Sequence, residues 1–145
     1  MTTVSDLESI ADHRGSVVKV ISIDSANFSG FGELYFSTVK AGVVKAWRRH
    51  TEMTVNLMVV TGKIRLVVLE HLDRAPELDI VLDGVDRKLV TIEPGKWFGF
   101  QGLSQNEAML MNFANIKHDD LEVERLNQDA EGVSYIWDSS ESDQK

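Results

Sequence analysis

The chain has 145 residues and a mass of 16.3 kDa, with 43% hydrophobic and 26% charged residues, which is typical of one globular domain with its own core. It contains no cysteine, which excludes a disulfide scaffold, a zinc–thiolate site and a thiol nucleophile. The net charge of −8 argues against nucleic acid as a partner.

The first six residues lack the basic and apolar order of a signal peptide, which predicts a cytoplasmic protein. No apolar run is long enough to span a bilayer, so no membrane partner is expected. Further along the chain the hydrophobic residues repeat mostly with a period of two, which is the pattern of strands. The predicted strands are residues 17–23, 32–40, 43–50, 53–60, 64–69, 78–82, 88–92, 97–100 and 108–113.

Turn residues divide these strands. Thr61-Gly62 predicts a hairpin between strands 53–60 and 64–69, and Asp83-Gly84 predicts a second pair, 78–82 with 88–92. Residues 119–126 are predicted to form a short helix, capped by Asp119 or Asp120, with Leu121, Val123 and Leu126 facing the core.

Many short strands with one late helix predict an all-β jelly roll of eight to ten strands. Residues 1–137 are predicted to form a single domain, and residues 138–145 a disordered acidic tail.

One segment is positively charged in this acidic chain. Between Glu33 and Glu52 there is no acidic residue. The basic residues of the segment are Lys40, Lys45, Arg48, Arg49 and His50. Such a segment indicates a site for a small anionic molecule, although a solvated strand would carry the same charges.

Several motifs in the chain carry a family resemblance. They are KAWRRHTEMTVNL from Lys45, PGKWFGFQGL from Pro94, LMNFANI from Leu110 with HD at His118, and DHRG from Asp12. Over roughly residues 10–137 these segments resemble the cupin superfamily, and within it the dTDP-4-dehydrorhamnose 3,5-epimerase-like family of dTDP-sugar isomerases.

The resemblance implies a cupin-type double-stranded β-helix, usually a homodimer whose subunits exchange N-terminal strands. It also implies a nucleotide-linked sugar as the ligand, bound in the mouth of the barrel. In the family, the arginine of D-x-R-G contacts the nucleotide phosphates, often from the neighbouring subunit, and that position is Arg14. Lys45, which begins the central motif, is a second phosphate candidate.

The chain departs from the family at the catalytic positions. Arg48 stands where the epimerases have the histidine base, and an arginine cannot accept a proton near neutral pH. The enolate-stabilising lysine falls near Val55, and no tyrosine lies at residues 115–118. Of the positions that bind metal in metal-dependent cupins only His50 is a ligand, so no metal and no other cofactor is expected.

Strand alternation and the family alignment nevertheless bring other reactive groups to the expected catalytic face. Arg48 and His50 share a face of one strand, and the alignment places Glu33, Tyr35 and Ser37 on the adjacent strand. His50 or Glu33 is the candidate base, Tyr35 the candidate acid, and Arg48 the cation that holds an enolate or carboxylate oxygen.

The remaining candidates are substrate-binding. Trp47 and Trp97 could form an aromatic wall for a sugar or base, with Ser37 and Asn112 as polar contacts. Each candidate also has a structural interpretation: the tryptophans as core residues, Glu33 with Arg48 as an ion pair, and His50 as a hydrogen-bonded core histidine.

Three functions therefore stay open. The first is an epimerase or isomerase of a nucleotide-linked keto-deoxysugar with a non-standard acid–base site. The second is a metal-independent cupin cyclase or isomerase of a secondary metabolite. The third is a non-catalytic cupin that binds a small molecule between its arginines. A homodimer is expected, both from the resemblance and because apolar edge strands need covering.

Overall fold

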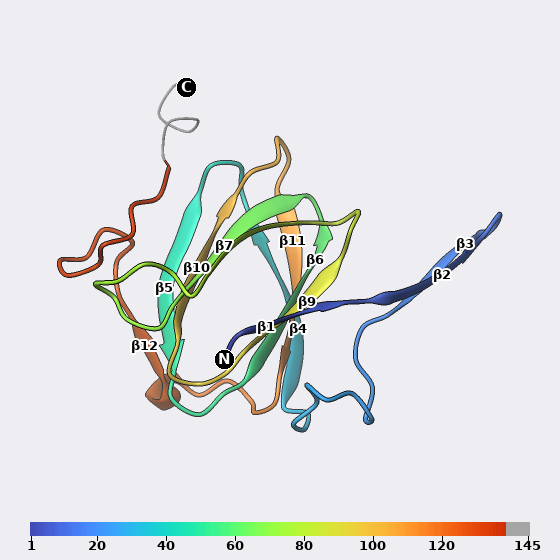
Figure 1. The fold of residues 1–145 in the computed structure, drawn as a ribbon, viewed down its shortest axis with the longest axis horizontal. Coiled ribbons are helices and arrows are strands. Elements are labelled where there is room, and N and C mark those ends of the chain that lie inside the picture. Colours follow the sequence, from blue (N-terminus) through green and yellow to red (C-terminus); the bar gives the residue numbers. More distant parts are fainter. Residues whose placement is uncertain (139–145) are drawn as a thin grey trace.

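The computed structural model describes residues 1–138, which form two facing antiparallel sheets of five strands and a separate two-stranded sheet (Figure 1). One sheet has the order β1 (Thr3–Asp6), β9 (Lys88–Ile92), β6 (Val55–Thr61), β11 (Ala108–Ala114), β4 (Glu33–Val39). The other has the order β12 (Val123–Arg125), β5 (Val44–His50), β10 (Trp97–Gly102), β7 (Lys63–Leu69), β8 (Leu78–Asp83). This is the predicted jelly roll.

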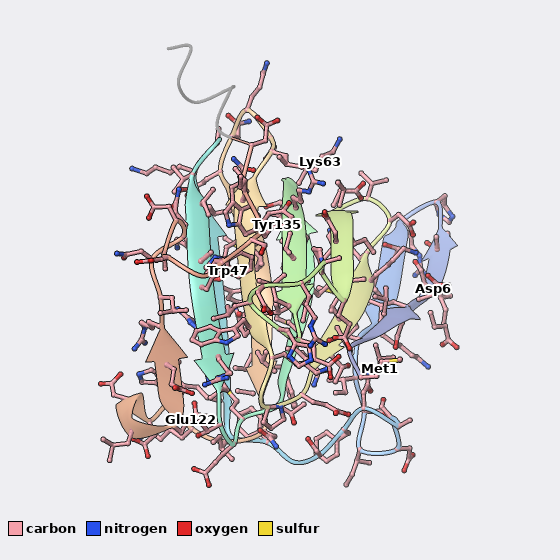
Figure 2. The ribbon with its side chains drawn as sticks, turned by 60° about the vertical axis from the view of Figure 1, so that its left-hand side comes forward. Met1, Asp6, Trp47, Lys63, Glu122 and Tyr135 are labelled. Carbon is pink, nitrogen blue, oxygen red and sulfur yellow. The ribbon has the colours of Figure 1, made fainter. Side chains whose placement is uncertain are left out.

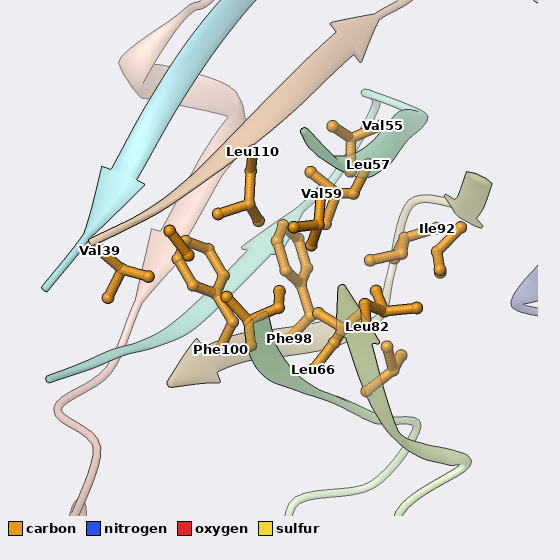
Figure 3. Packing of buried hydrophobic residues seen from close by; sticks show 14 of the residues in the cluster. Val39, Val55, Leu57, Val59, Leu66, Leu82, Ile92, Phe98, Phe100 and Leu110 are labelled. Carbon is orange, nitrogen blue, oxygen red and sulfur yellow. The ribbon is translucent and has the colours of Figure 1, made fainter. Parts of the chain in front are cut away.

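The hydrophobic core lies between the two sheets and fills only part of the barrel. Phe98 and Phe100 of β10 extend into the space between them, against Leu57 and Leu110 from the opposite sheet (Figure 3). The cluster is completed by aliphatic side chains from β6, β7, β8 and β9: Val55, Val59, Ile64, Leu66, Val68, Leu82, Val90 and Ile92. The polar residues that face inward come from β4, β5, β11 and β12, and they are Tyr35, Ser37, Lys45, Arg48, Asn112 and Arg125.

The two predicted hairpins are wrong, although their strands are present. β6 pairs with β9 and β11, whereas β7 pairs with β8 and β10, so the turn at Gly62 carries the chain from one sheet to the other. Gly62 has φ +85°, and a Cβ there would collide with Ala108. β8 and β9 likewise belong to different sheets. From β4 to β12 consecutive strands lie in different sheets, except β7 and β8, which are paired neighbours in one sheet. A short turn permits a crossing between sheets as well as a hairpin.

The predicted helix over residues 119–126 is also wrong. The structure has one 3₁₀ turn, Asp120–Glu122, capped by the Asp119 side chain, and then strand β12. Leu121, predicted to face the core, is 94% exposed. The backbone of β12 pairs with the edge of β5, so strand pairing replaces the helical hydrogen bonds.

The segment after β12 runs back over the outer face of β5. Tyr135 and Trp137 lie against Trp47 there, with ring centroids 5.9 and 5.2 Å from the Trp47 ring (Figure 2). Trp47 is 1% exposed and belongs to this second cluster together with Trp97. The C-terminal segment therefore covers an apolar sheet face that would otherwise meet water.

The N-terminal region holds strands that the hydrophobic pattern did not predict. β1 adds to the edge of one sheet, and β2 (Glu8–Asp12) pairs only with β3 (Gly15–Lys19). The predicted strand 17–23 is correspondingly shorter and begins earlier. This hairpin projects away from the barrel in Figure 1, so its alternation is not driven by burial in the core.

The predicted acidic tail, residues 138–145, lies outside the described residues apart from Asp138. Within the described part of the chain, no helix has the length and hydrophobicity needed to cross a membrane.

Candidate functional site

A cavity of about 740 Å³ opens between the polar edges of the two sheets. Its floor and walls come from β4 and β11 on one side and from β5 and β10 on the other, with β12 and the following residues closing one edge. The Trp47 ring packs in the outer-face cluster, so this predicted substrate-binding residue borders the cavity without presenting its ring to it. The lining residues are Tyr35, Ser37, Lys45, Ala46, Trp47, Arg48, Val55, Phe98, Phe100, Asn112, Arg125, Leu126, Asn127 and Ala130. This volume is large enough for a small organic ligand.

A β-bulge in β5 turns two basic residues to the same face. Phe98 pairs with Arg48, but Phe100 pairs with Lys45, so β5 has one residue more than β10 across this stretch. The facing residue of β10 is Gly99, where a Cβ would collide with the Ala46 side chain. Simple alternation would place Lys45 and Arg48 on opposite faces, and the bulge brings both into the cavity.

The charge of the cavity is positive. Three cationic side chains line it, Lys45, Arg48 and Arg125, and none of the described lining residues is a carboxylate. The Lys45 Nζ donates to the Thr38 carbonyl at 2.6 Å. In a chain of net charge −8, three cations facing one cavity favour an anionic ligand.

Tyr35 is the ionisable phenol of the cavity. Burial raises its pKa, the nearby Arg48 lowers it, and Glu33 raises it, so that the phenol stays protonated above its usual range. Beside it on β11, Asn112 is 5% exposed and donates from Nδ2 to the Ser37 hydroxyl at 3.0 Å. Tyr35, Ser37 and Asn112 thus form a polar wall of the cavity.

His50, the last residue of β5, and Glu122, the last residue of the 3₁₀ turn, form a buried pair. The Nδ1 atom of His50 lies 2.5 Å from Glu122 Oε1, and the side chains are 5% and 2% exposed. The second oxygen, Oε2, accepts the backbone N–H groups of Glu52 and Met53 at 3.2 and 3.1 Å. The His50 ring stacks on Phe98, which lines the cavity, so the imidazole lies one side chain behind the cavity wall.

The pair is held as a neutral imidazole and an ionised carboxylate. Burial lowers the pKa of His50 and outweighs the attraction of Glu122. Burial raises the pKa of Glu122, but the hydrogen bonds from His50 and from the two backbone amides outweigh it and hold that pKa below its usual range. Nδ1 of the neutral ring therefore carries the proton and donates it to Glu122, which leaves Nε2 as the basic nitrogen.

The other predicted residues lie outside the cavity. Glu33 does not line it, and accepts the backbone N–H of His118 at 3.0 Å. The alignment placed Glu33 on the strand adjacent to that of Arg48. In the structure β4 pairs with β11 and not with β5, so this placement is wrong. Trp97 lies on the outer face, where the Arg49 guanidinium is 4.7 Å from its ring centroid. Arg14 is on the projecting hairpin, bound to Asp12 at 2.7 Å.

Two side chains of the candidate site, Glu122 and Arg125, are absent from the residues that the sequence predicts for it. Glu122 was assigned to a helix, and Arg125 lay beyond the recognised motifs. The sequence holds no local signal for Arg125, which ends the run Glu122-Val123-Glu124-Arg125. Only the pairing of β12 with β5 shows which of these charges face the barrel. Among the described residues, no group of three or more His, Cys, Asp or Glu is arranged to hold a metal ion.

Two relatives match this chain over nearly all of its length. The probable low-salt glycan biosynthesis epimerase of Haloferax volcanii is 31% identical over 144 residues, covering 94% of this chain and 92% of the relative. The chain belongs to the cupin family of sugar epimerases and dTDP-sugar isomerases. A dTDP-sugar isomerase from Desulfovibrio desulfuricans is 33% identical, with a TM-score of 0.84, and the match covers 97% of this chain and 94% of that one.

More distant members of the family support the fold alone. A 4-keto-6-deoxy sugar epimerase from the novobiocin biosynthetic gene cluster of Streptomyces spheroides is 19% identical with a TM-score of 0.81, covering 94% of this chain and 74% of that one. No protein-family model matches the sequence. Family membership confirms the resemblance that the motifs carried.

Proposed function

We propose that this protein is an epimerase or isomerase acting on a nucleotide-linked keto-deoxysugar, with a rebuilt acid–base site. The observation that carries the proposal is the cavity in the barrel, lined by Lys45, Arg48 and Arg125 beside the phenol of Tyr35. Such a set of cations suits the diphosphate group of a nucleoside diphosphate. Phe98 and Phe100 add an apolar surface on which a deoxysugar can rest.

The proposed chemistry is the removal and return of a proton at the carbon next to the sugar's keto group. His50, neutral and with Nδ1 bound to Glu122, would take the proton at Nε2 through a bridging water, because its ring lies behind Phe98. Arg48 would stabilise the enolate oxygen, and the Tyr35 hydroxyl would return a proton to carbon. Glu122 is a positioning residue in this scheme, because it fixes which nitrogen of His50 is basic.

A homodimer would complete the site. Arg14 is 79% exposed at the end of the projecting hairpin and lies outside the cavity of its own chain. Ile10 and Val17 of the same hairpin are 56% and 59% exposed, which is unfavourable in water and favourable against a second copy. We propose that the hairpin of each subunit packs on its partner and brings Arg14 to the partner's phosphates.

Nucleotide binding tests the proposal. Titration with dTDP, UDP, GDP and CDP should give one nucleotide that raises the free energy of unfolding by about 2.7 kcal/mol at 100 times its Kd. The variant Arg14→Ala should weaken that binding, because a charge-assisted contact to phosphate is lost. Calorimetry measures the affinity and thermal unfolding the stabilisation. Arg74→Ala, another exposed arginine outside the cavity lining, is the control.

Turnover is tested separately, by incorporation of deuterium from solvent into a dTDP-linked 4-keto-6-deoxysugar. The result that contradicts the proposal is a protein that binds none of the four nucleotides and exchanges no proton. Equal binding by wild type and Arg14→Ala, or a monomer in solution, would remove the role given to Arg14.

A second candidate function is a cupin that binds the sugar nucleotide without turning it over. It is favoured by one observation, that neither His50 nor Glu33 is among the side chains lining the cavity. Tight nucleotide binding with no deuterium incorporation would support this alternative.

A further inference from the structure

The register of β12 against β5 pairs opposite charges on one face of the sheet and like charges on the other. Glu124 pairs with Arg49, and Arg125 pairs with Arg48. Residues directly opposite in an antiparallel pair point to the same face. On the outer face the pair is one of opposite charges, with Arg49 Nη2 at 2.8 Å and Nε at 2.9 Å from Glu124 Oε1.

On the inner face the same register places two positively charged side chains opposite each other. Arg48 and Arg125 lie opposite one another, and both line the cavity. Arg48 forms no ion pair with a described carboxylate, and the carboxylate nearest to Arg125 is that of Asp120, at 4.0 Å. Asp120 is itself 80% exposed and lies 2.9 Å from His118 Nε2. Neither guanidinium group therefore has a close carboxylate, and both are solvated by water instead, since Arg48 is exposed and the Arg125 side chain is 53% exposed.

Like charges directly opposite in a sheet destabilise it, so the arrangement costs stability in the empty protein. An oxyanion between two guanidinium groups removes that repulsion and accepts several N–H donors, each in a charge-assisted hydrogen bond. We propose that Arg48 and Arg125 form a two-arginine clamp that binds one oxyanion of the ligand in the cavity.

The chemistry of the clamp suits a phosphate group of a nucleoside diphosphate or a carboxylate on the sugar, since either presents paired oxygens to arginine forks. Arg48 has five N–H donors, so it can share an oxyanion with Arg125 on one side and still face Tyr35 on the other. The clamp extends the proposed function by naming what holds the anionic part of its substrate, yet anion binding itself requires no turnover.

Calorimetric titration with inorganic pyrophosphate, dTDP and glucuronate tests the clamp on wild type, Arg125→Gln and Arg49→Gln. Arg125→Gln should weaken binding of the recognised anion by roughly 10- to 100-fold. The Tm of its empty form should stay the same or rise by roughly 1–3 °C, because a repulsion is removed. Arg49→Gln is the matched control on the next residue of β5, and it should keep the affinity while lowering the Tm.

Each outcome of these titrations supports or overturns the two-arginine clamp. Wild type that binds none of the three anions, or Arg125→Gln that binds as tightly as wild type, overturns the clamp. Equal weakening by Arg49→Gln also overturns it, because the effect would then be one of general charge. Binding of pyrophosphate and dTDP but not glucuronate assigns the clamp to phosphate, and the reverse assigns it to a carboxylate. If Arg125→Gln loses the anion while wild type exchanges no sugar proton, the clamp stands and the proposed enzymatic function fails.

Discussion

Replacing Glu122 by alanine is expected to lower the free energy of unfolding by about 3–5 kcal/mol and the Tm by roughly 10 °C or more. The substitution removes the acceptor for His50, and both side chains are at least 95% buried. It also leaves the N–H groups of Glu52 and Met53 without the carboxylate oxygen they donate to. Urea and thermal unfolding measure the loss.

Glu124→Ala is the matched control for this prediction. Glu124 lies two residues further on and also binds a β5 side chain, Arg49. In this ion pair the Arg49 side chain is 34% exposed and the Glu124 side chain 48%. An exposed pair of this kind contributes only about 0.2–1 kcal/mol. A loss from Glu122→Ala no larger than that from Glu124→Ala would contradict the buried-pair interpretation.

The same pair makes the stability of the wild type depend on pH. The folded pKa values of His50 and Glu122 lie below their ordinary values of 6.5 and 4.5, so the unfolded chain binds more protons in acid. The stabilisation is complete above pH 6.5 and is lost as the pH falls through the two folded values. We expect the unfolding free energy to fall below pH 6.5, and to fall less steeply between pH 6.5 and 5 in His50→Gln.

Tyr35→Phe is expected to reduce solvent-proton exchange on the keto-sugar substrate by roughly 10²- to 10⁴-fold, the usual contribution of a general acid or base. Tyr35 is the phenol among the described residues lining the cavity, and its pKa responds to Arg48 beside it. Phenylalanine keeps the ring, so nucleotide affinity and Tm should stay near those of wild type. Deuterium incorporation measured by mass spectrometry gives the rate.

Tyr135→Phe is the control, because Tyr135 is the chain's other tyrosine and lies on the outer face against Trp47. It should leave exchange unchanged. His50→Gln probes the base: the amide can still donate to Glu122, so exchange should be lost with a small change in Tm. Exchange that survives in both Tyr35→Phe and His50→Gln would remove the proposed acid–base roles, and a large fall in the Tm of His50→Gln would make His50 a core residue.

Most strands could be predicted from the sequence. Burial of one face imposes a period of two on strands such as β11, and burial of both faces makes β6 a continuous apolar run. The pairing of the strands could not be predicted. Gly62 permits a hairpin and an inter-sheet turn equally, and only the packing of β6 and β7 into opposite sheets separates the two. The prediction of a helix over residues 119–126 is wrong because the backbone of β12 forms its hydrogen bonds with the edge of β5.

The candidate site divides in the same way. Tyr35, Ser37, Arg48 and Asn112 were predicted and meet in one cavity. Glu122 was missed because its partner, His50, is 72 residues away in the chain, and no local pattern marks a contact of that range.

The family, the jelly-roll class and the positive charge of the central segment follow from the amino-acid sequence, because motifs, alternation and composition are local properties of the chain. Tertiary structure alone decided which charges meet. The bulge in β5 turned Lys45 toward Arg48, and the register of β12 set Arg125 beside them while pairing Arg49 with Glu124 on the other face. A shift of one residue in that register would exchange the two faces, so the charge of the cavity is a property of strand pairing and not of composition.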